Sequence, residues 1–153
     1  MFLTPHAIAG IYIGSQVSNV WLAFMLGIIS HLILDFIPHG DEGLADNWTR
    51  SQKIKRLSLF VAIEMLIIVL MTYLLISQKI IDLTPTILAG LIGSILPDYI
   101  WGFHEITHDR ISGWISSKIL NGIHHLLPIK LPFAFGIFIQ LGTLAIFLFL
   151  LLN

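Results

Sequence analysis

The chain has 153 residues, of which 56% are hydrophobic and 11% are charged, and its formal net charge is −1. Soluble globular domains average about 25% charged residues. The composition therefore predicts a single membrane-embedded domain over residues 1–153, and the lack of excess positive charge argues against nucleic acid as a partner. The sequence contains no cysteine, so disulfides and thiolate ligands are excluded. Any metal ion must be held by His, Asp or Glu.

The first two predicted helices form a hairpin. Residues 2–17 are apolar and rich in small residues, and Ser18-Asn19 predicts a tight turn. A second apolar segment follows at 20–37, close to the length of about 20 residues that a membrane-spanning helix needs. If the chain reverses at residue 18, His6 and His31 lie at nearly the same depth.

The second segment carries an unusual set of ionisable residues. His31 and Asp35 are four residues apart, so both project from one face of the helix. Pro38 ends the helix, and His39 and Asp41 follow at once. Ionisable groups at membrane depth are costly and usually mark a functional site, and imidazole with carboxylate suits Zn²⁺, Mn²⁺ or Fe²⁺. We expect half of a metal centre here, at the boundary between membrane and cytoplasm; a buried His–Asp hydrogen bond between helices is the alternative.

Three more spans are expected along the chain, at residues 57–77, 84–101 and 131–152. Glu64 interrupts the first of these and should face the bundle interior, where pairing with a polar group is favoured over a role in proton transfer. Pro97 should kink the next span and hold the Asp98 carboxylate in a polar cavity; a helix-ending turn is the alternative. The predicted fold is an all-α, multi-pass membrane bundle of about five transmembrane helices plus a short amphipathic helix.

The segment 102–130 is polar and is expected to hold that amphipathic helix. His124 and His125 diverge on a helix, so one could bind a metal while the other meets substrate. The alternative is an interfacial helix with both histidines on its polar face. His104 and His108 repeat the spacing of four residues, which fits a second metal half-site or a solvated helix start equally well.

Lysine and arginine residues predict the orientation. Loop 38–56 carries four, segment 102–130 carries three, and the opposite side has only Lys79. By the positive-inside rule both loops are cytoplasmic. The candidate ligands His6, His31, Asp35 and Asp98 then share one cytoplasmic end. We expect a multi-pass protein of the inner (cytoplasmic) membrane with a site that faces the cytoplasm.

Two sequence patterns concern helix packing. Gly10 and Gly14 form a pair of small residues that would let another helix approach closely. Residues 27–37 align with residues 90–100 at an offset of 63. This weak repeat predicts that the second and fourth helices run parallel. A competing match of residues 3–10 with residues 83–90 would need opposite orientations, and apolar sequence produces such matches easily.

The ordered set of motifs resembles a known family. It comprises Thr4-Pro5-His6, Ser30-His31-x-x-x-Asp35-x-x-Pro38-His39-x-Asp41, Leu96-Pro97-Asp98 and a late His-His pair. This pattern is similar to that of the YdjM/YbcI-type inner-membrane proteins, which are described as membrane-bound metal-dependent hydrolases. The resemblance extends from residue 4 to about residue 126. It implies a metal surrounded by His6, His31, Asp35, His39, Asp41, Asp98, His124 and His125.

The function expected from these features is hydrolysis of a lipid or lipid-linked phosphoester at the cytoplasmic leaflet. Zinc or manganese would be the cofactor, Asp35 would act at the metal, and His124 or His125 would protonate the leaving group. The His-x-x-x-Asp spacing is also similar to that of the all-α zinc-dependent phospholipase C and single-strand nuclease group, which favours phosphoesters as substrates. This chain departs from that group because it is shorter and membrane-embedded.

Two other functions are compatible with the sequence. A metal-ion transporter or a metal-sensing membrane protein would also use intramembrane acidic groups and interrupted helices. However, the outer half of the predicted bundle has almost no ionisable groups, which favours a one-sided site over a conduit. A membrane scaffold is the third possibility and would make the seven histidines incidental.

Overall fold

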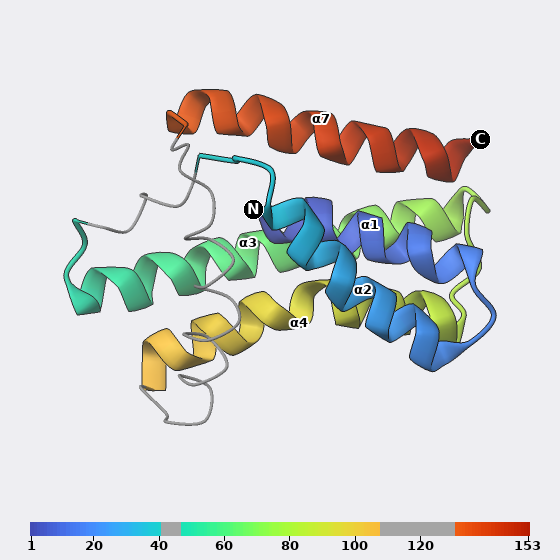
Figure 1. Ribbon diagram of the computed structural model, residues 1–153, viewed down its shortest axis with the longest axis horizontal. Helices are drawn as coiled ribbons and strands as arrows, with labels where there is room; N and C mark the ends of the chain where they lie inside the picture. Colours follow the sequence, from blue (N-terminus) through green and yellow to red (C-terminus); the bar gives the residue numbers. More distant parts are fainter. Residues whose placement is uncertain (41–46, 108–130) are drawn as a thin grey trace.

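The computed structural model describes residues 1–40, 47–107 and 131–153 (Figure 1). The described residues form five helices: α1 (Leu3–Gln16), α2 (Val20–Asp35), α3 (Arg50–Ser77), α4 (Pro85–Thr107) and α7 (Phe133–Leu152). The predicted all-α fold is confirmed. Three of these helices, α3, α4 and α7, are long and apolar enough to cross a membrane, while α2 is a shorter apolar helix. The predicted amphipathic helix falls within residues that the structure does not describe.

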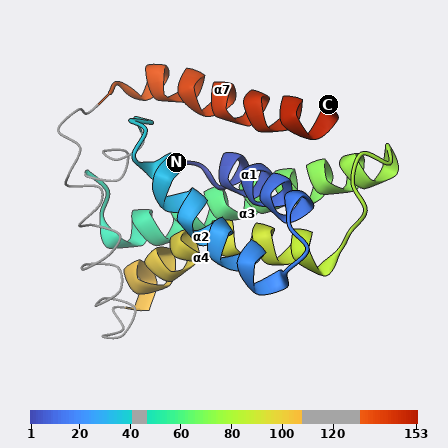
Figure 2. The ribbon, with the colours of Figure 1, turned by 45° about the vertical axis from the view of Figure 1, so that its right-hand side comes forward.

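Helix α1 runs through the centre of the bundle and contacts all four of the other described helices (Figures 1 and 2). Its residues Ala7, Ile8, Ala9 and Ile11 have no exposed surface. A helix that is buried on every side is typically apolar all round, and beyond Thr4 and His6 the buried residues of α1 are aliphatic or small. By contrast, α3 and α7 expose many large apolar side chains along their outer faces, as helices in contact with lipid do.

Small residues allow α1, α2 and α4 to approach closely. A Cβ atom added at Gly10 or at Gly90 would overlap the backbone of the facing helix, and one added at Gly27 would lie 2.5 Å from the carbonyl oxygen of Gly90. Without side chains at these positions the backbones themselves come into contact. The close approach predicted from Gly10 and Gly14 is therefore confirmed, and α4 is the partner.

Helices α2 and α4 lie side by side and run in the same direction (Figures 1 and 2). The positions related by the weak repeat face one another, with Gly27 against Gly90 and His31 against Ser94. The parallel arrangement that the repeat predicts is confirmed. It brings the polar ends of both helices to one end of the bundle.

Two helix boundaries differ from the prediction. Helix α3 begins at Arg50, seven residues before the expected start, because Thr49 and Gln52 form a capping box that satisfies its first free N–H groups. Helix α4 continues to Thr107, beyond the expected end at residue 101, and contains Pro97 in its interior. The turn at Ser18-Asn19 is as expected, since the Asn19 side chain caps α2 by accepting a hydrogen bond from Leu22 N at 3.0 Å.

Candidate metal centre

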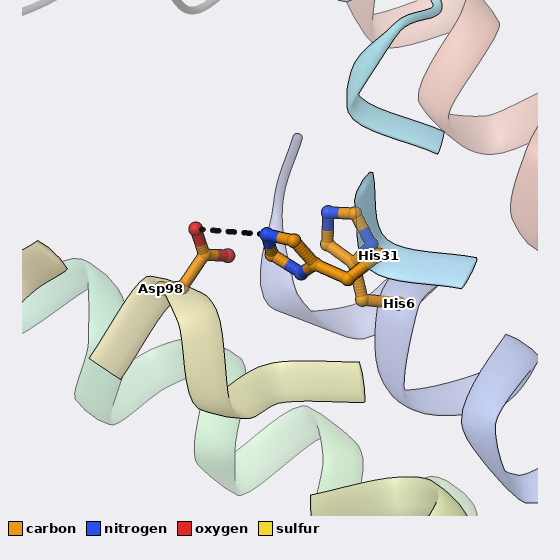
Figure 3. Close-up of side chains that lie close together, drawn as sticks. All are labelled: His6, His31 and Asp98. Carbon is orange, nitrogen blue, oxygen red and sulfur yellow. Dashed lines mark ion pairs between the residues drawn. The ribbon is translucent and has the colours of Figure 1, made fainter. Parts of the chain in front are cut away.

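The rings of His6 and His31 stack at the centre of the site. Their centroids are 4.1 Å apart and their planes differ by 27° (Figure 3). His6 comes from the first turn of α1 and His31 from the last turns of α2, and both are almost completely buried. The approach of His6 to His31, which was predicted from a reversal of the chain near residue 18, is confirmed.

Asp98 completes a group of three potential ligands. His6, His31 and Asp98 each offer one ligand atom, and these three atoms lie within 4.8 Å of one another. The carboxylate of Asp98 points from α4 toward the His31 ring, with 3.7 Å between Oδ1 and Nε2 (Figure 3). These residues form a buried group that could hold a metal ion. The Asp98 side chain is 31% exposed, so this edge of the group is open to the surroundings.

The hydrogen bonds of His31 define which of its nitrogen atoms is available. Nδ1 lies 2.8 Å from the carbonyl oxygen of Ser94; a carbonyl only accepts, so Nδ1 carries the hydrogen and a neutral ring has its lone pair on Nε2. That atom faces Asp35 Oδ2 at 3.1 Å and Asp98 Oδ1 at 3.7 Å. A lone pair beside two carboxylates is stable only if a proton or a metal cation lies between them. Metal-binding histidines typically show this pattern, with the second nitrogen donating to a carbonyl.

Asp35 links the two stacked histidines. Its Oδ1 atom is 3.1 Å from His6 Nε2, while its Oδ2 atom contacts His31. Because a carboxylate only accepts, His6 donates through Nε2 and keeps its lone pair on Nδ1. His6 Nδ1 is buried and has no hydrogen-bond partner among the described residues. An unsatisfied buried atom costs about 1–3 kcal/mol, and a metal ion is a partner that would remove this cost.

A positive charge lies at the other side of Asp35. The amino group of Met1 is 3.0 Å from Asp35 Oδ1 and 2.7 Å from His39 Nε2. His39 Nδ1 bonds the carbonyl oxygen of Ile37 at 2.8 Å, so its Nε2 presents a lone pair, as in His31. His39 is almost completely buried. Asp35 thus has the Met1 amino group as a cation at Oδ1, and its Oδ2 atom would stabilise a second cation beside His31 Nε2.

The interior position of Pro97 explains how α4 contributes two groups to the site. Proline has no N–H and therefore leaves the carbonyl of Gly93 without its helical hydrogen bond. The next carbonyl, that of Ser94, accepts the bond from His31, and Asp98 follows Pro97 directly. The alternative of a helix-ending turn at Pro97-Asp98 is wrong, because α4 continues for two more turns.

Other candidate residues have different positions. Asp41, His108, His124 and His125 lie outside the described residues, so their proposed roles stay predictions. Glu64 accepts hydrogen bonds from the N and Oγ1 atoms of Thr4 at 2.8 and 2.7 Å. Its predicted pairing with a polar group of the core is confirmed.

Two groups near the site are not among the residues expected from the sequence: the Ser94 carbonyl and the Gln140 side chain. The carbonyl has no sequence signal apart from its position before Pro97. Gln140 does have one, since it is a lone amide in an otherwise apolar helix and is 3% exposed.

Apolar residues separate the site from the opposite end of the bundle. Beyond His6, the buried residues Ile8 and Ile11 of α1 pack against Leu75, Ile81 and Ile87. A cavity of about 530 Å³ lies past this cluster, at the C-terminal end of α1, and is lined by residues that include Gln16 and Asp82. The ligand group and this cavity are at opposite ends of α1.

Comparisons of the chain with protein-family models, curated proteins and solved structures find no match. The resemblance to the YdjM/YbcI-type proteins therefore stays a prediction. The contacts of His31 with Ser94, Asp35 and Asp98 are the basis for the function proposed below.

Proposed function

We propose that this protein is a membrane-embedded, metal-dependent hydrolase that acts on a phosphoester of a lipid or lipid-linked substrate. The observation that carries the proposal is the buried group His6, His31 and Asp98 beside Asp35. The group contains two imidazoles and two carboxylates, which are the ligand types that bind zinc and manganese in proteins. The YdjM/YbcI resemblance adds the same expectation from the sequence.

Each residue of the set has a role that follows from its surroundings. His31 would bind through Nε2 and His6 through Nδ1, because their other nitrogen atoms already donate hydrogen bonds. Asp35 is almost buried and would fix the ion, while the partly exposed Asp98 lies where substrate and water can enter. A zinc or manganese ion held there would activate water and neutralise charge on a phosphoryl group. Asp41 would complete the set, and His39 would join it only if the Met1 amino group left its Nε2 atom. His124 or His125 would protonate the leaving group.

The proposed location is the inner membrane, with five spans and the site at the cytoplasmic leaflet. Helices α3, α4 and α7 are apolar and long enough to cross a bilayer, and α1 and α2 would form the other two spans as a tight hairpin. Among the described residues, Arg50, Lys53, Lys55 and Arg56 lie in the first two turns of α3, at the end of the bundle that holds the site. There Arg56 stacks on Trp48 at 4.9 Å. Such residues attract anionic lipid phosphates to the interface.

The transport alternative has less support. A conduit would need polar groups beyond His6, but the next part of the bundle is the apolar cluster around Ile8 and Ile11. Glu64, the other acidic residue at membrane depth, is engaged with Thr4. Both observations favour a site that opens on one side.

Metal analysis of the detergent-purified protein tests the ligand set. Wild type should contain zinc or manganese in a ratio to protein of about one or above, and His31→Ala and Asp98→Asn should lose most of it. Asp82→Asn is the matched control, because it removes an equivalent carboxylate at the opposite end of the bundle. An equal metal content in all four proteins, or none in wild type, would contradict the proposal.

Enzyme assays test the reaction. Wild type should cleave short-chain phospholipid or phosphomonoester analogues in detergent micelles, and both a chelator and Asp35→Asn should abolish the cleavage. Activity that survives both treatments would rule out the metal-hydrolase assignment. Metal-dependent flux into liposomes without hydrolysis would show transport instead.

A further inference from the structure

The start of α1 is buried among the other helices, so its free N–H groups need partners within the protein. The first N–H groups of a helix have no acceptor within the helix, and membrane interiors offer no water to replace one. The N-cap residue, Phe2, has no side-chain capping bond, and Pro5 has no N–H. The remaining N–H groups of this turn therefore depend on other helices.

Helix α3 supplies one of these partners. Glu64 Oε2 accepts from the backbone N–H of Thr4 at 2.8 Å and from its hydroxyl at 2.7 Å. The residues are 60 positions apart in the sequence. A carboxylate at a helix N-terminus also interacts favourably with the helix dipole. Glu64 thus caps α1 from a neighbouring helix, and the capped turn ends at His6.

Helix α7 supplies the other partner. Gln140 Oε1 accepts from Phe2 N at 2.9 Å, and its Nε2 donates to the carbonyl oxygen of His39 at 3.0 Å. One side chain thereby joins the start of α1 to the segment after α2. Gly136, one turn earlier on α7, packs so closely on the His39 carbonyl that a Cβ atom there would overlap it. Both backbone elements that carry His6 and His39 are held by α7.

We infer that Glu64 and Gln140 are positioning residues for the metal centre. They would fix the first turn of α1 and the His39 segment against Asp35, so that metal affinity depends on two side chains that do not bind the metal. The inference rests on the proposed function, since it assumes that His6 faces a metal ion and that His39, through the Met1 amino group, helps to hold Asp35 in place. It assigns a purpose to the carboxylate of Glu64 in α3 and to the amide of Gln140 in α7.

The experiment compares paired variants at each position with a control on the same helix. Gln140→Leu and Glu64→Leu remove the hydrogen bonds. Glu64→Gln keeps an acceptor for Thr4, and Gln140→Glu keeps the acceptor for Phe2 but loses the donor to His39. Thr143→Val is the control, because Thr143 is also buried on α7 and bonds only the Ile139 carbonyl of its own helix.

Three measurements are made on each protein: the zinc dissociation constant, the melting temperature, and the visible absorption bands of the Co²⁺-substituted form. Loss of a residue that orients a metal ligand typically weakens binding about 10–100-fold. We expect such a loss, with altered cobalt bands, in Gln140→Leu, Gln140→Glu and Glu64→Leu. Glu64→Gln should bind close to the wild-type value, and Thr143→Val should change only the melting temperature.

Two different failures can be told apart. If wild type binds no metal, the proposed function fails and this inference fails with it. If wild type binds zinc but Gln140→Leu and Glu64→Leu bind it as tightly as Thr143→Val, with unchanged cobalt bands, the two residues only stabilise the fold. Should the leucine variants not fold, Gln140→Glu and Glu64→Gln decide the outcome, because equal zinc affinity in these two would overturn the inference.

Discussion

Among the described residues, His31 has the contacts that bear most directly on metal binding. Its two nitrogen atoms have different partners, a backbone carbonyl on one side and two carboxylates on the other. The backbone bond fixes the ring orientation and the tautomer, so that Nε2 is the atom available to a metal ion. The spacing of four residues places Asp35 on the same face of α2, with Oδ2 beside Nε2 of His31.

This assignment predicts the nitrogen spectrum of His31. In ¹⁵N NMR of the zinc-free protein at neutral pH, Nδ1 should show a bound hydrogen. Addition of Zn²⁺ should shift the Nε2 signal while Nδ1 keeps its hydrogen, because the Ser94 carbonyl still accepts it. A shift confined to Nδ1 would contradict the orientation described above. His31→Ala identifies the signals.

Individual helices contribute to the site through close backbone contacts as well as through their side chains. Helix α4 is close enough to α1 and α2 to place Ser94 and Asp98 beside His31 because Gly90 has no side chain. The same closeness makes the contact sensitive to size. Overpacking a well-packed contact typically costs about 1–3 kcal/mol.

Gly90→Ala should therefore lower the stability of the protein by at least that amount. Its added Cβ would overlap the Gly10 carbonyl, and α4 would have to move away from α1. Gly142→Ala is the control, since nothing lies within 4 Å of a Cβ atom at that position. Thermal unfolding in detergent gives the measurement. Equal melting temperatures for the two variants would mean that the close α1–α4 contact does not form.

Pro97 gives a second prediction for α4. Replacing proline by alanine inside a helix removes an intrinsic cost of about 3 kcal/mol and restores an N–H for the Gly93 carbonyl. Pro97→Ala should thus not lower the melting temperature, yet it should weaken zinc binding by changing the position of Asp98 relative to His31. Zinc titration beside thermal unfolding separates the two effects. Unchanged zinc affinity would show that the proline is not needed for the position of Asp98.

The described part of the molecule has the possible ligand group at one end and an open cavity at the other. The ligand group lies at the end of the bundle where α1 begins and α2 finishes, while the apolar cluster around Ile8 separates it from the cavity at the far end of α1. Helix α3 has 28 residues, about 42 Å at 1.5 Å per residue. It exceeds the bilayer core of about 30 Å, so both of its ends should reach water.

That geometry allows a direct test of the proposed topology. The chain has no cysteine, so single cysteines can be introduced at Ser51 and Ser77, which are exposed at opposite ends of α3. A membrane-impermeant maleimide should label Ser77→Cys in intact cells and should label Ser51→Cys only after permeabilisation. The reverse pattern would invert the orientation, and labelling of both from one side would mean that α3 does not cross the membrane.

Helices, turns and shared helix faces depend on residues that are close in the sequence, so these features of the protein could be predicted from it. Helices in an apolar environment must satisfy their own backbone hydrogen bonds, so apolar runs, Ser18-Asn19 and the i,i+4 pair of His31 and Asp35 predict helices, a turn and a shared face. The start of α3 differs from the prediction because the capping box lies in a polar stretch, where hydropathy alone predicts a loop. The end of α4 was misplaced because Pro97 was expected near a helix terminus.

Only the tertiary structure decided the partners of the polar groups around the site. The bond from His31 to Ser94 and the bonds of Glu64 and Gln140 to the start of α1 join residues between 60 and 138 positions apart. Apolar helices can pack in many arrangements of similar energy, and sequence patterns do not choose among them. Here the contacts of a few glycines and a few buried polar groups select one arrangement, because small residues set how closely helices approach and each buried hydrogen-bonding group needs a specific partner.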